Sequence, residues 1–308
     1  MPTGSSPSLS KPPLPETTVR RPPSRRLAGV LLRQKSATLF RHFPPALTGD
    51  EEALHQVRVW GRRLRVAVRL LAGKPDGRRA QRAERSLSCL TRAAGGARDL
   101  DVLLATFDQR LGGLPARTPE QRRLRHRLAA RRRRGRARMV EAMLDQPVAR
   151  LRADLAQLVA RACPDQATND QRLHSTFARE GGKLLDGLAA LGSLLDIVVL
   201  HALRRRARRL RYTVEIHGQI AGSLAATKPW KELQDRIGVL HDHHVLAEWL
   251  DGQARADAQR GHPALAAAAA TEAAWARQTM ARLHDEYLAS APTALVRAGL
   301  SAIGFAIE

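Results

Sequence analysis

The sequence has few aromatic residues, few cysteines and few acidic residues relative to its basic ones. Phe, Trp and Tyr together make up 4% of the 308 residues, and many apolar positions are Ala or Leu, which favours helix nearly throughout. The two cysteines, Cys89 and Cys163, lie in no CxxC pattern, so we expect no disulfide scaffold and a cytoplasmic protein. The sequence contains no apolar run long enough for a transmembrane helix and no signal core near its start, so neither membrane insertion nor secretion is expected.

Basic residues are in large excess over acidic ones. Lys and Arg number 52 against 29 Asp and Glu, which gives a net charge of +23 and an isoelectric point near 11.6. Such a balance indicates a polyanionic partner: nucleic acid, an anionic membrane surface or an inorganic polyanion. The length allows one large domain or two smaller ones, each with an ample core.

One basic stretch occurs twice. Residues 54–66 read LHQVRVWGRRLRV and residues 200–212 read LHALRRRARRLRY, so the copies lie 146 positions apart. Without a gap, the matched pairs are Leu54/Leu200, His55/His201, Arg58/Arg204, Arg62/Arg208, Arg63/Arg209, Leu64/Leu210 and Arg65/Arg211. A match of this length indicates an internal duplication rather than two unrelated basic helices.

Each copy predicts an amphipathic helix with two stripes. In the first copy the apolar stripe is Leu54, Val57, Gly61, Leu64, Val68 and Leu71. At helical spacing the basic stripe beside it is His55, Arg58, Arg62, Arg65 and Arg69. The second copy repeats it with His201, Arg204, Arg208 and Arg211. A single stripe of this kind is usually a solvated face, but two stripes in the same register favour an anion-binding site.

A second element is also repeated, about thirty residues after each basic helix. GGARDLDVL at 95–103 aligns with GVLHDHHVL at 238–246, so that Asp99 matches Asp242. We expect these carboxylates, together with Asp101, to cap a helix or to pair with an arginine of the repeated helix and orient it.

Several segment boundaries follow from the same patterns. We expect a disordered tail at 1–25, which is rich in Pro and Ser, and a weakly patterned tail at 291–308. A helix from about 26 should end before the prolines at 44–45, and the glycines at 95–96 should break the chain before another helix. The basic helix expected at 119–145 contains many arginines that point in all directions, so most of them should be solvated.

The motifs LHQVRVWGRRLRV, GGARDLDVLL, LHALRRRARRLRYTVE and LQDRIGVLHD together resemble the CHAD domain, the conserved histidine α-helical domain, over about residues 26–290. The resemblance implies an all-α fold of two pseudo-symmetric four-helix bundles, here about 26–162 and 170–290, with basic helices along a central groove or pore. It also implies binding of inorganic polyphosphate and, in bacteria, association with polyphosphate granules. The anion-binding positions implied are His55, Arg58, Arg62, Arg63, Arg65, His201, Arg204, Arg208, Arg209, Arg211 and Tyr212.

Three further basic residues are candidates for the same site. They are Arg69 at the end of the first stripe, Lys183 on the helix before the second copy, and Arg205 within it. The sequence departs from the family pattern at His241 and His243, and it contains no β-rich segment that would form a companion triphosphatase domain. It therefore resembles a stand-alone copy.

Other functions have less support in the sequence. His241 and His244 are spaced to chelate a metal, but they have no further ligand at helical spacing, so we favour surface histidines at a capped helix start over metal binding. No nucleophile or oxyanion motif accompanies His55 or His201, so we predict a non-enzymatic polyphosphate-binding protein without a cofactor. The alternatives are a non-specific nucleic-acid-binding protein and, less favoured, a phosphoanhydride-processing enzyme. The sequence leaves the oligomeric state and the preferred chain length open.

Overall fold

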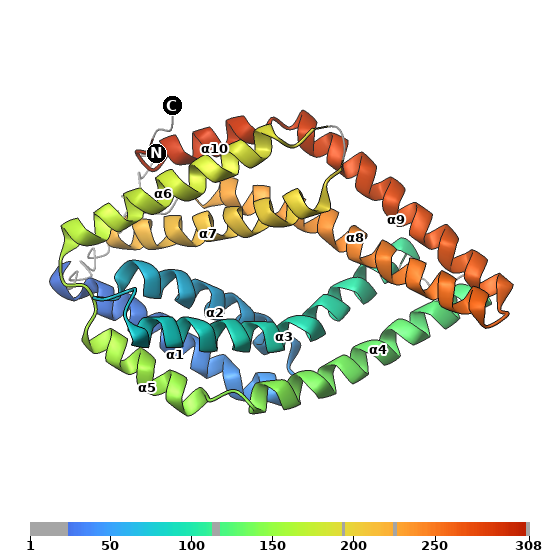
Figure 1. Ribbon diagram of the computed structural model, residues 1–308, viewed down its shortest axis with the longest axis horizontal. Helices are drawn as coiled ribbons and strands as arrows, with labels where there is room; N and C mark the ends of the chain where they lie inside the picture. Colours follow the sequence, from blue (N-terminus) through green and yellow to red (C-terminus); the bar gives the residue numbers. More distant parts are fainter. Residues whose placement is uncertain (1–23, 113–117, 193–194, 224–226, 306–308) are drawn as a thin grey trace, which may run out of the picture.

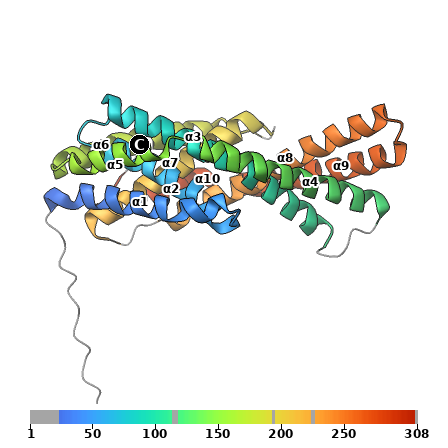
Figure 2. The ribbon, with the colours of Figure 1, turned by 90° about the horizontal axis from the view of Figure 1, so that it is seen from below.

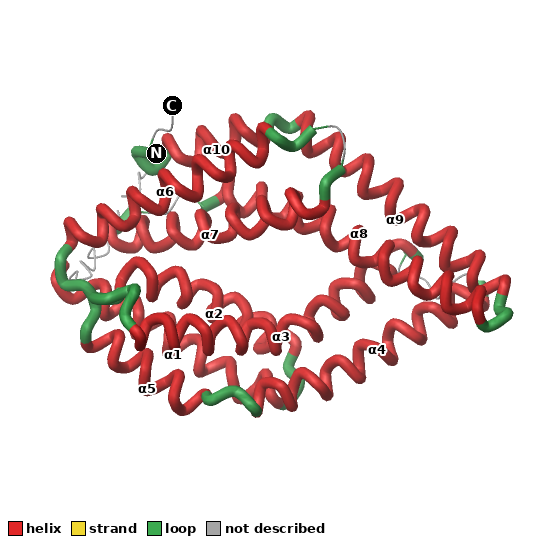
Figure 3. The backbone as a smooth tube through the Cα atoms, viewed as in Figure 1, coloured by secondary structure: helices red, strands yellow, loops and turns green. Residues whose placement is uncertain are grey.

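The computed structural model describes residues 24–112, 118–192, 195–223 and 227–305. Within these ranges the chain forms ten α-helices and no strand, which confirms the predicted all-α fold (Figure 3). The helices are α1 (Ser24–Leu47), α2 (Glu51–Leu71), α3 (Arg78–Arg110), α4 (Pro119–Leu144), α5 (Val148–Ala160), α6 (Gln166–Ala189), α7 (Ile197–Ala221), α8 (Lys228–Gln259), α9 (Pro263–Ala289) and α10 (Pro292–Ser301). None of these helices is both long and apolar enough to cross a membrane.

The two halves of the chain repeat the same order of helix lengths. Helices α1 and α6 each have 24 residues, and the two repeated basic helices, α2 and α7, have 21 and 25. Each is followed by a long helix, α3 with 33 residues and α8 with 32, and the short helices α5 and α10 end the series with 13 and 10. Since each half contributes five described helices, its organisation as a four-helix bundle stays a prediction.

Two hydrophobic cores hold the helices together, and both cores contain residues from both halves. The larger core includes Leu64 of α2 and Leu210 of α7, which are fully buried. The smaller core joins the C-terminal part of α3 and the start of α4 to α8 and α9 through Phe107, Leu128 and Leu250. Figures 1 and 2 show an elongated, flattened molecule in which the α3–α4 and α8–α9 pairs meet at the end far from α1 and α5. The middle parts of α3, α4 and α8 therefore lie between the two cores.

The prolines at 44–45 do not end the first helix as predicted. Helix α1 continues through Pro44 and Pro45 to Leu47. A proline removes one helical hydrogen bond, but here the loss falls in the last turn, and burial of Ala46 and packing of Phe43 against the core offset it. The amide of Asp50 then donates to the carbonyl of Pro45 at 3.1 Å, which closes the turn before α2.

The glycines at 95–96 likewise do not interrupt their helix, because α3 runs from residue 78 to residue 110. Each glycine costs a helix about 1 kcal/mol relative to alanine, whereas the burial of Leu90, Ala94 and Leu103 on one face favours a continuous helix. The matching residues 238–246 also lie inside a helix, α8. The expected helix starts at Asp99 and at Asp242 are therefore wrong, and neither aspartate is a cap.

The expected tail at 291–308 contains a helix. Residues 292–301 form α10, in which Val296 and Leu300 are buried in the larger core. At Gly299 the ring of Trp230 lies 3.0 Å from where a Cβ would be, so this helix packs closely on α8. The tail expected at 1–25 lies outside the described residues, except for the first two residues of α1.

Both repeated helices begin at a capping aspartate, and the apolar stripe of α2 packs as the sequence predicts. Asp50 caps α2 by accepting a hydrogen bond from the amide of Ala53 at 2.6 Å, and Asp196 caps α7 through the amide of Val198 at 2.8 Å. All six residues of the predicted apolar stripe of α2 are buried. The absence of a side chain at Gly61 brings α2 close to α3, because a Cβ there would lie 2.4 Å from a methyl group of Thr91.

Candidate anion-binding site

Helices α2 and α7 run beside one another and are in contact (Figure 1), and four arginines of these helices lie close enough to influence one another's charge. They are Arg58 and Arg62 of α2 and the matching Arg204 and Arg208 of α7. Burial, the charge of Arg58 and the charge of Arg204 lower the pKa of Arg62 to about 10. Burial and the charges of Arg62 and Arg204 lower the pKa of Arg208 to about 9. We call these four residues the arginine cluster.

The arginine cluster is only partly neutralised by carboxylates. Arg58 donates to Asp99 Oδ1 and to the carbonyl oxygen of Gly95, each at 3.1 Å. In the second half the matching pair, Arg204 and Asp242, is 4.0 Å apart. Among the described side chains, Arg62 and Arg208 form no direct ion pair with an acid. Two guanidinium groups at the centre are thus half-buried beside like charges, which is costly unless an anion binds there.

The two repeated aspartates therefore lie beside matching arginines, and Asp101 does not. Asp99 and Asp242 each neighbour the first arginine of their own half, although they belong to continuous helices rather than caps. Asp101 is buried against α4, where it accepts from Arg132 and Arg136. Its partners are thus arginines of α4, which also pair with Glu51 in the first turn of α2, so Asp101 helps to fix α4 to α3 and to the start of α2 instead of orienting an arginine of the basic stripe.

Arg63, Arg211 and Tyr212 lie in the contact between the halves. Arg63 donates to both carboxylate oxygens of Glu215, at 2.9 and 3.0 Å, and Arg211 Nε lies 3.8 Å from the same carboxylate. Tyr212 is 3% exposed, and the guanidinium carbons of Arg63 and Arg211 lie 5.5 and 5.1 Å from its ring centre. The sequence did not separate these residues from the arginine cluster. We call Arg63, Arg211, Glu215 and Lys35 the joint cluster.

Lys35 of α1 is the member of the joint cluster that the sequence analysis missed. Its side chain is 4% exposed and donates to Gln219 Oε1 of α7 at 2.9 Å. Burial lowers the pKa of Lys35 to about 8, with Glu215 opposing that effect and Arg63 adding to it. The available signal was its position in α1, four residues after Leu31 and four before Leu39, which places a lysine on the apolar face.

Two further arginines predicted for the site, Arg69 and Arg209, are paired with acids. Arg69 donates to Glu84 Oε2 at 2.7 Å, and Arg209 pairs with the buried carboxylate of Glu180. Burial acts to raise the pKa of Glu180, but the neighbouring arginines hold it below its usual value. Arg65 lies near Arg69 and Arg209 with its Nε buried and unbonded, and burial followed by the charge of Arg69 lowers its pKa.

The remaining predicted residues are His55, His201, Arg205 and Lys183. His201 is exposed, with its ring centre 5.4 Å from that of His241, and its pKa is lowered by burial, by His241 and by Arg205. His55 is half-buried, and Arg205 and Lys183 are exposed on α7 and α6. At neutral pH, His201 is therefore mostly uncharged, and the permanent charges of this site belong to the arginines.

The histidines of α8 form no metal site in the described part of the chain, where no three His, Cys, Asp or Glu residues are arranged to hold an ion. His244 lies 3.6 Å from Glu248, and His241 lies 3.5 Å from Asp242. They occupy the middle of α8, so the expected capped helix start is wrong here.

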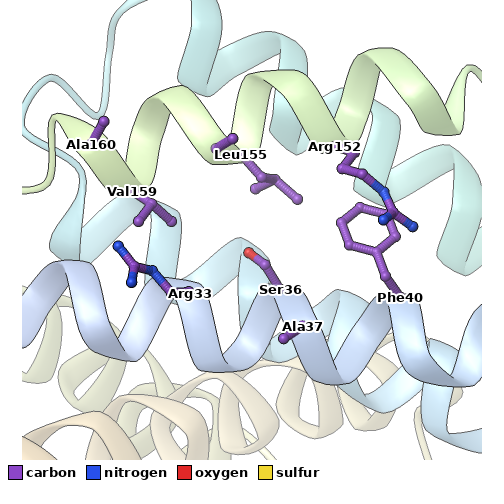
Figure 4. Close-up of a pocket in the computed structure, with 9 residues that line it drawn as sticks. Arg33, Ser36, Ala37, Phe40, Arg152, Leu155, Val159 and Ala160 are labelled. Carbon is purple, nitrogen blue, oxygen red and sulfur yellow. The ribbon is translucent and has the colours of Figure 1, made fainter.

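A shallow groove between α1 and α5 lies apart from the arginine cluster (Figure 4). Its volume is about 320 Å³, its walls are mainly apolar, and the guanidinium carbon of Arg152 lies 4.5 Å from the ring centre of Phe40 at one end. With Arg33 as its other charged residue, this groove lacks the concentration of positive charge found between α2 and α7.

The fold and the paired basic helices define an all-helical protein, and sequence comparison gives its family. The CHAD domain family profile matches residues 30–251, and the chain belongs to this family. The fold is similar to that of a crystal structure of the CHAD domain from the plant Ricinus communis, with a TM-score of 0.62, 23% identity, and coverage of 90% of this chain and 91% of that one. It is also similar to PptA from Streptomyces chartreusis, with a TM-score of 0.61, 17% identity, and coverage of 92% and 99%. No curated protein matches the sequence.

Proposed function

We propose that the protein binds inorganic polyphosphate through the arginine cluster, and that it does so as a non-enzymatic binding module. The observation that carries this proposal is the position of Arg62 and Arg208, which are half-buried beside other arginines without an acid partner among the described residues. Membership of the CHAD family supports it, because the family resemblance implies this ligand.

The chemistry of the arginine cluster suits a chain of phosphates. A polyphosphate carries about one negative charge per unit and has no bases, so its recognition needs spaced cations with two donors each, which guanidinium groups provide. Asp99 and Asp242 would hold the outer arginines, Arg58 and Arg204, in position, while Arg62 and Arg208 at the centre contact the ligand. The remaining predicted contacts, including Arg65, His55 and His201, would extend this path along the two helices.

Competition with nucleic acid tests the assignment. Fluorescently labelled long-chain polyphosphate is bound to the protein at moderate salt, and unlabelled polyphosphate or duplex DNA is added at equal phosphate concentration. We expect polyphosphate to displace the label far more effectively than DNA. Equal displacement by DNA would favour a non-specific nucleic-acid-binding protein, and release of phosphate during incubation with a divalent metal would favour an enzyme.

The location of the protein in the cell is a second part of the proposal. Binding to polyphosphate would place the protein at polyphosphate granules in the bacterial cytoplasm. A tagged protein should co-localise with such granules, and a variant with Arg62→Gln and Arg208→Gln should be diffuse. Granule association of that variant at wild-type level would separate localisation from the arginine cluster.

A further inference from the structure

A larger cavity lies between α3, α4 and α8, in the region between the two hydrophobic cores. Its volume is about 690 Å³, which lies within the range of small-molecule sites. Three arginines, two acids and several apolar side chains surround it. Asp99, which pairs with Arg58 of the arginine cluster, stands at its edge, so the cavity adjoins the proposed polyphosphate site but is built from different helices.

The arginines at this cavity differ from their neighbours on the same helices. Arg92, Arg131 and Arg138 line the cavity and are exposed; within the described residues they form no ion pair. By contrast, Arg132 and Arg136 of α4 turn to Asp101 and Glu51 and are paired there. The paired arginines of α4 therefore lie on one side of the helix, and its two unpaired arginines, Arg131 and Arg138, line the cavity.

The two acids that line the cavity already have basic neighbours. Asp99 accepts from Arg58 at 3.1 Å, and Glu248 lies 3.6 Å from His244 Nε2. The three unpaired arginines outnumber them, so the local charge favours an anion.

The apolar residues in the wall of the cavity favour a ligand that has apolar surface, which a bare phosphate chain lacks. Leu103, Met139 and Trp249 line it and are 4%, 3% and 8% exposed, and Leu100 and Val245 add further apolar surface. Burial of apolar ligand surface contributes about 25 cal/mol per Å², and a bare phosphate chain has no such surface to bury. The combination suits a ligand with phosphates at one end and an apolar or aromatic body at the other.

We propose that this cavity binds a phosphate ester with a flat organic body, of the nucleoside phosphate class. Arg92, Arg131 and Arg138 would hold the phosphates, and the organic body would pack against Leu100 and Val245 and the accessible edges of Met139 and Trp249. This is a second ligand site, separate from the proposed polyphosphate site, and it stands or falls independently of that proposal.

Titration calorimetry with ATP and with inorganic tripolyphosphate, in magnesium-free buffer, tests the proposal on the full-length Arg62→Gln and Arg208→Gln variant, in which the proposed polyphosphate site is weakened and the cavity is unchanged. Both ligands carry a triphosphate, so their difference isolates the organic body. We expect ATP to bind at least about tenfold more tightly than tripolyphosphate, since burial of about 60 Å² of apolar surface is enough for that factor. Equal or weaker binding of ATP would overturn the proposal.

Two variants locate the binding in the cavity. A Cβ at Gly252 meets no atom within 4 Å, so Gly252→Leu fills the cavity from α8 without a clash and replaces a poor helix former with a good one. It should reduce ATP affinity by at least about tenfold. Wild-type ATP affinity in a folded Gly252→Leu protein would overturn the proposal.

The paired substitution Arg131→Gln and Arg138→Gln should weaken ATP about tenfold. Its matched control is Arg133→Gln with Arg134→Gln, which removes the same charge from exposed residues of α4 outside the cavity. An equal loss in both double variants would mean that general charge holds ATP, and this would contradict the proposed site. Long-chain polyphosphate binding by the Arg62→Gln and Arg208→Gln variant is measured in parallel, so that failure of one proposal is distinguished from failure of the other.

Discussion

The arginine cluster and the joint cluster both lie between α2 and α7, with Lys35 of α1 added to the joint cluster, yet they differ in how their charges are balanced. In the joint cluster, Glu215 receives two hydrogen bonds from Arg63 and lies 3.8 Å from Arg211. In the arginine cluster, Arg62 and Arg208 face other arginines, and burial together with like charges lowers the pKa of each. Both places are rich in basic residues, with four arginines in one and two arginines and a lysine in the other, so the position of one carboxylate separates a structural contact from a candidate binding site.

The two clusters should also have opposite effects on the stability of the free protein. The joint cluster connects the two halves of the chain and should contribute to the free energy of unfolding. The arginine cluster carries mutual repulsion and should lower that free energy until an anion binds. Substitutions in the two clusters should therefore affect different measurements.

The largest effect is expected from charge reversal in the arginine cluster. Arg62→Glu with Arg208→Glu should reduce the affinity for long-chain polyphosphate by at least about 100-fold, because two central cations become repulsive. Fluorescence anisotropy with labelled polyphosphate measures the loss. The control, Arg133→Glu with Arg134→Glu on α4, makes the same change in net charge and should lose less than about threefold. Equal losses would remove the distinction between this cluster and general surface charge.

The next effect concerns the joint cluster. Glu215→Gln leaves Arg63, Arg211 and Lys35 without their carboxylate, and it should lower the free energy of unfolding by about 2 kcal/mol. Chemical denaturation measures this change. Polyphosphate affinity of the folded variant should stay within about threefold of wild type. A strong loss of affinity with unchanged stability would reverse the roles given to the two clusters.

A smaller effect of opposite sign should follow from Arg208→Met. Without ligand, removal of one of four neighbouring positive charges should stabilise the protein by about 1 kcal/mol, visible as a higher Tm in low salt. The gain should shrink in high salt because screening already weakens the repulsion. A lower Tm in low salt would show that Arg208 has a stabilising partner in the free protein.

The smallest effect should appear in the pH dependence of binding. The pKa of His201 is lowered by burial and by neighbouring positive charges, so the residue is mostly neutral at pH 7. A bound polyanion favours its protonated form, so polyphosphate affinity should rise a few-fold as the pH falls from 7 to about 5.5. His201→Gln should show a shallower rise, and an unchanged pH profile would exclude His201 from the site.

Without ligand, the same residue affects stability in the opposite direction. Because the folded-state pKa lies below the unfolded value, the unfolded chain takes up the proton more readily as the pH falls through about 6.5. His201 therefore costs stability at low pH, and His201→Gln should remove that cost. Thermal unfolding between pH 5 and pH 7 measures the difference.

The sequence predicted the all-α fold and the repeated amphipathic helices because apolar residues recur along a helix at a regular spacing. The apolar stripe of α2 follows from spacing alone, and all six of its residues are buried in the structure. The boundaries at Pro44 and Gly95 could not be predicted, because tertiary packing offsets a local helix-breaking preference of only a few kcal/mol.

The sequence predicted which helix faces carry the basic residues of the site, but it could not predict which of these residues pair with an acid. The sequence placed Arg62 and Arg63 in one candidate set, although they point to different environments, one among arginines and one onto Glu215. The two environments differ because an acid that is distant in sequence pairs with one arginine and not with the other. The 152 positions between Arg63 and Glu215 carry no local signal of the contact, which arises only when α2 and α7 pack together.

The salt dependence of polyphosphate binding tests the central claim most directly. Affinity is measured at several salt concentrations for the wild type, for Arg62→Gln with Arg208→Gln, and for Arg133→Gln with Arg134→Gln. Each cation that contacts a single polyanion chain contributes about 0.7 to the slope of log affinity against log salt. We predict that the slope falls by about 1.4 in the first variant and stays at the wild-type value in the second. The same slope in all three proteins would contradict the claim that Arg62 and Arg208 contact the phosphate chain.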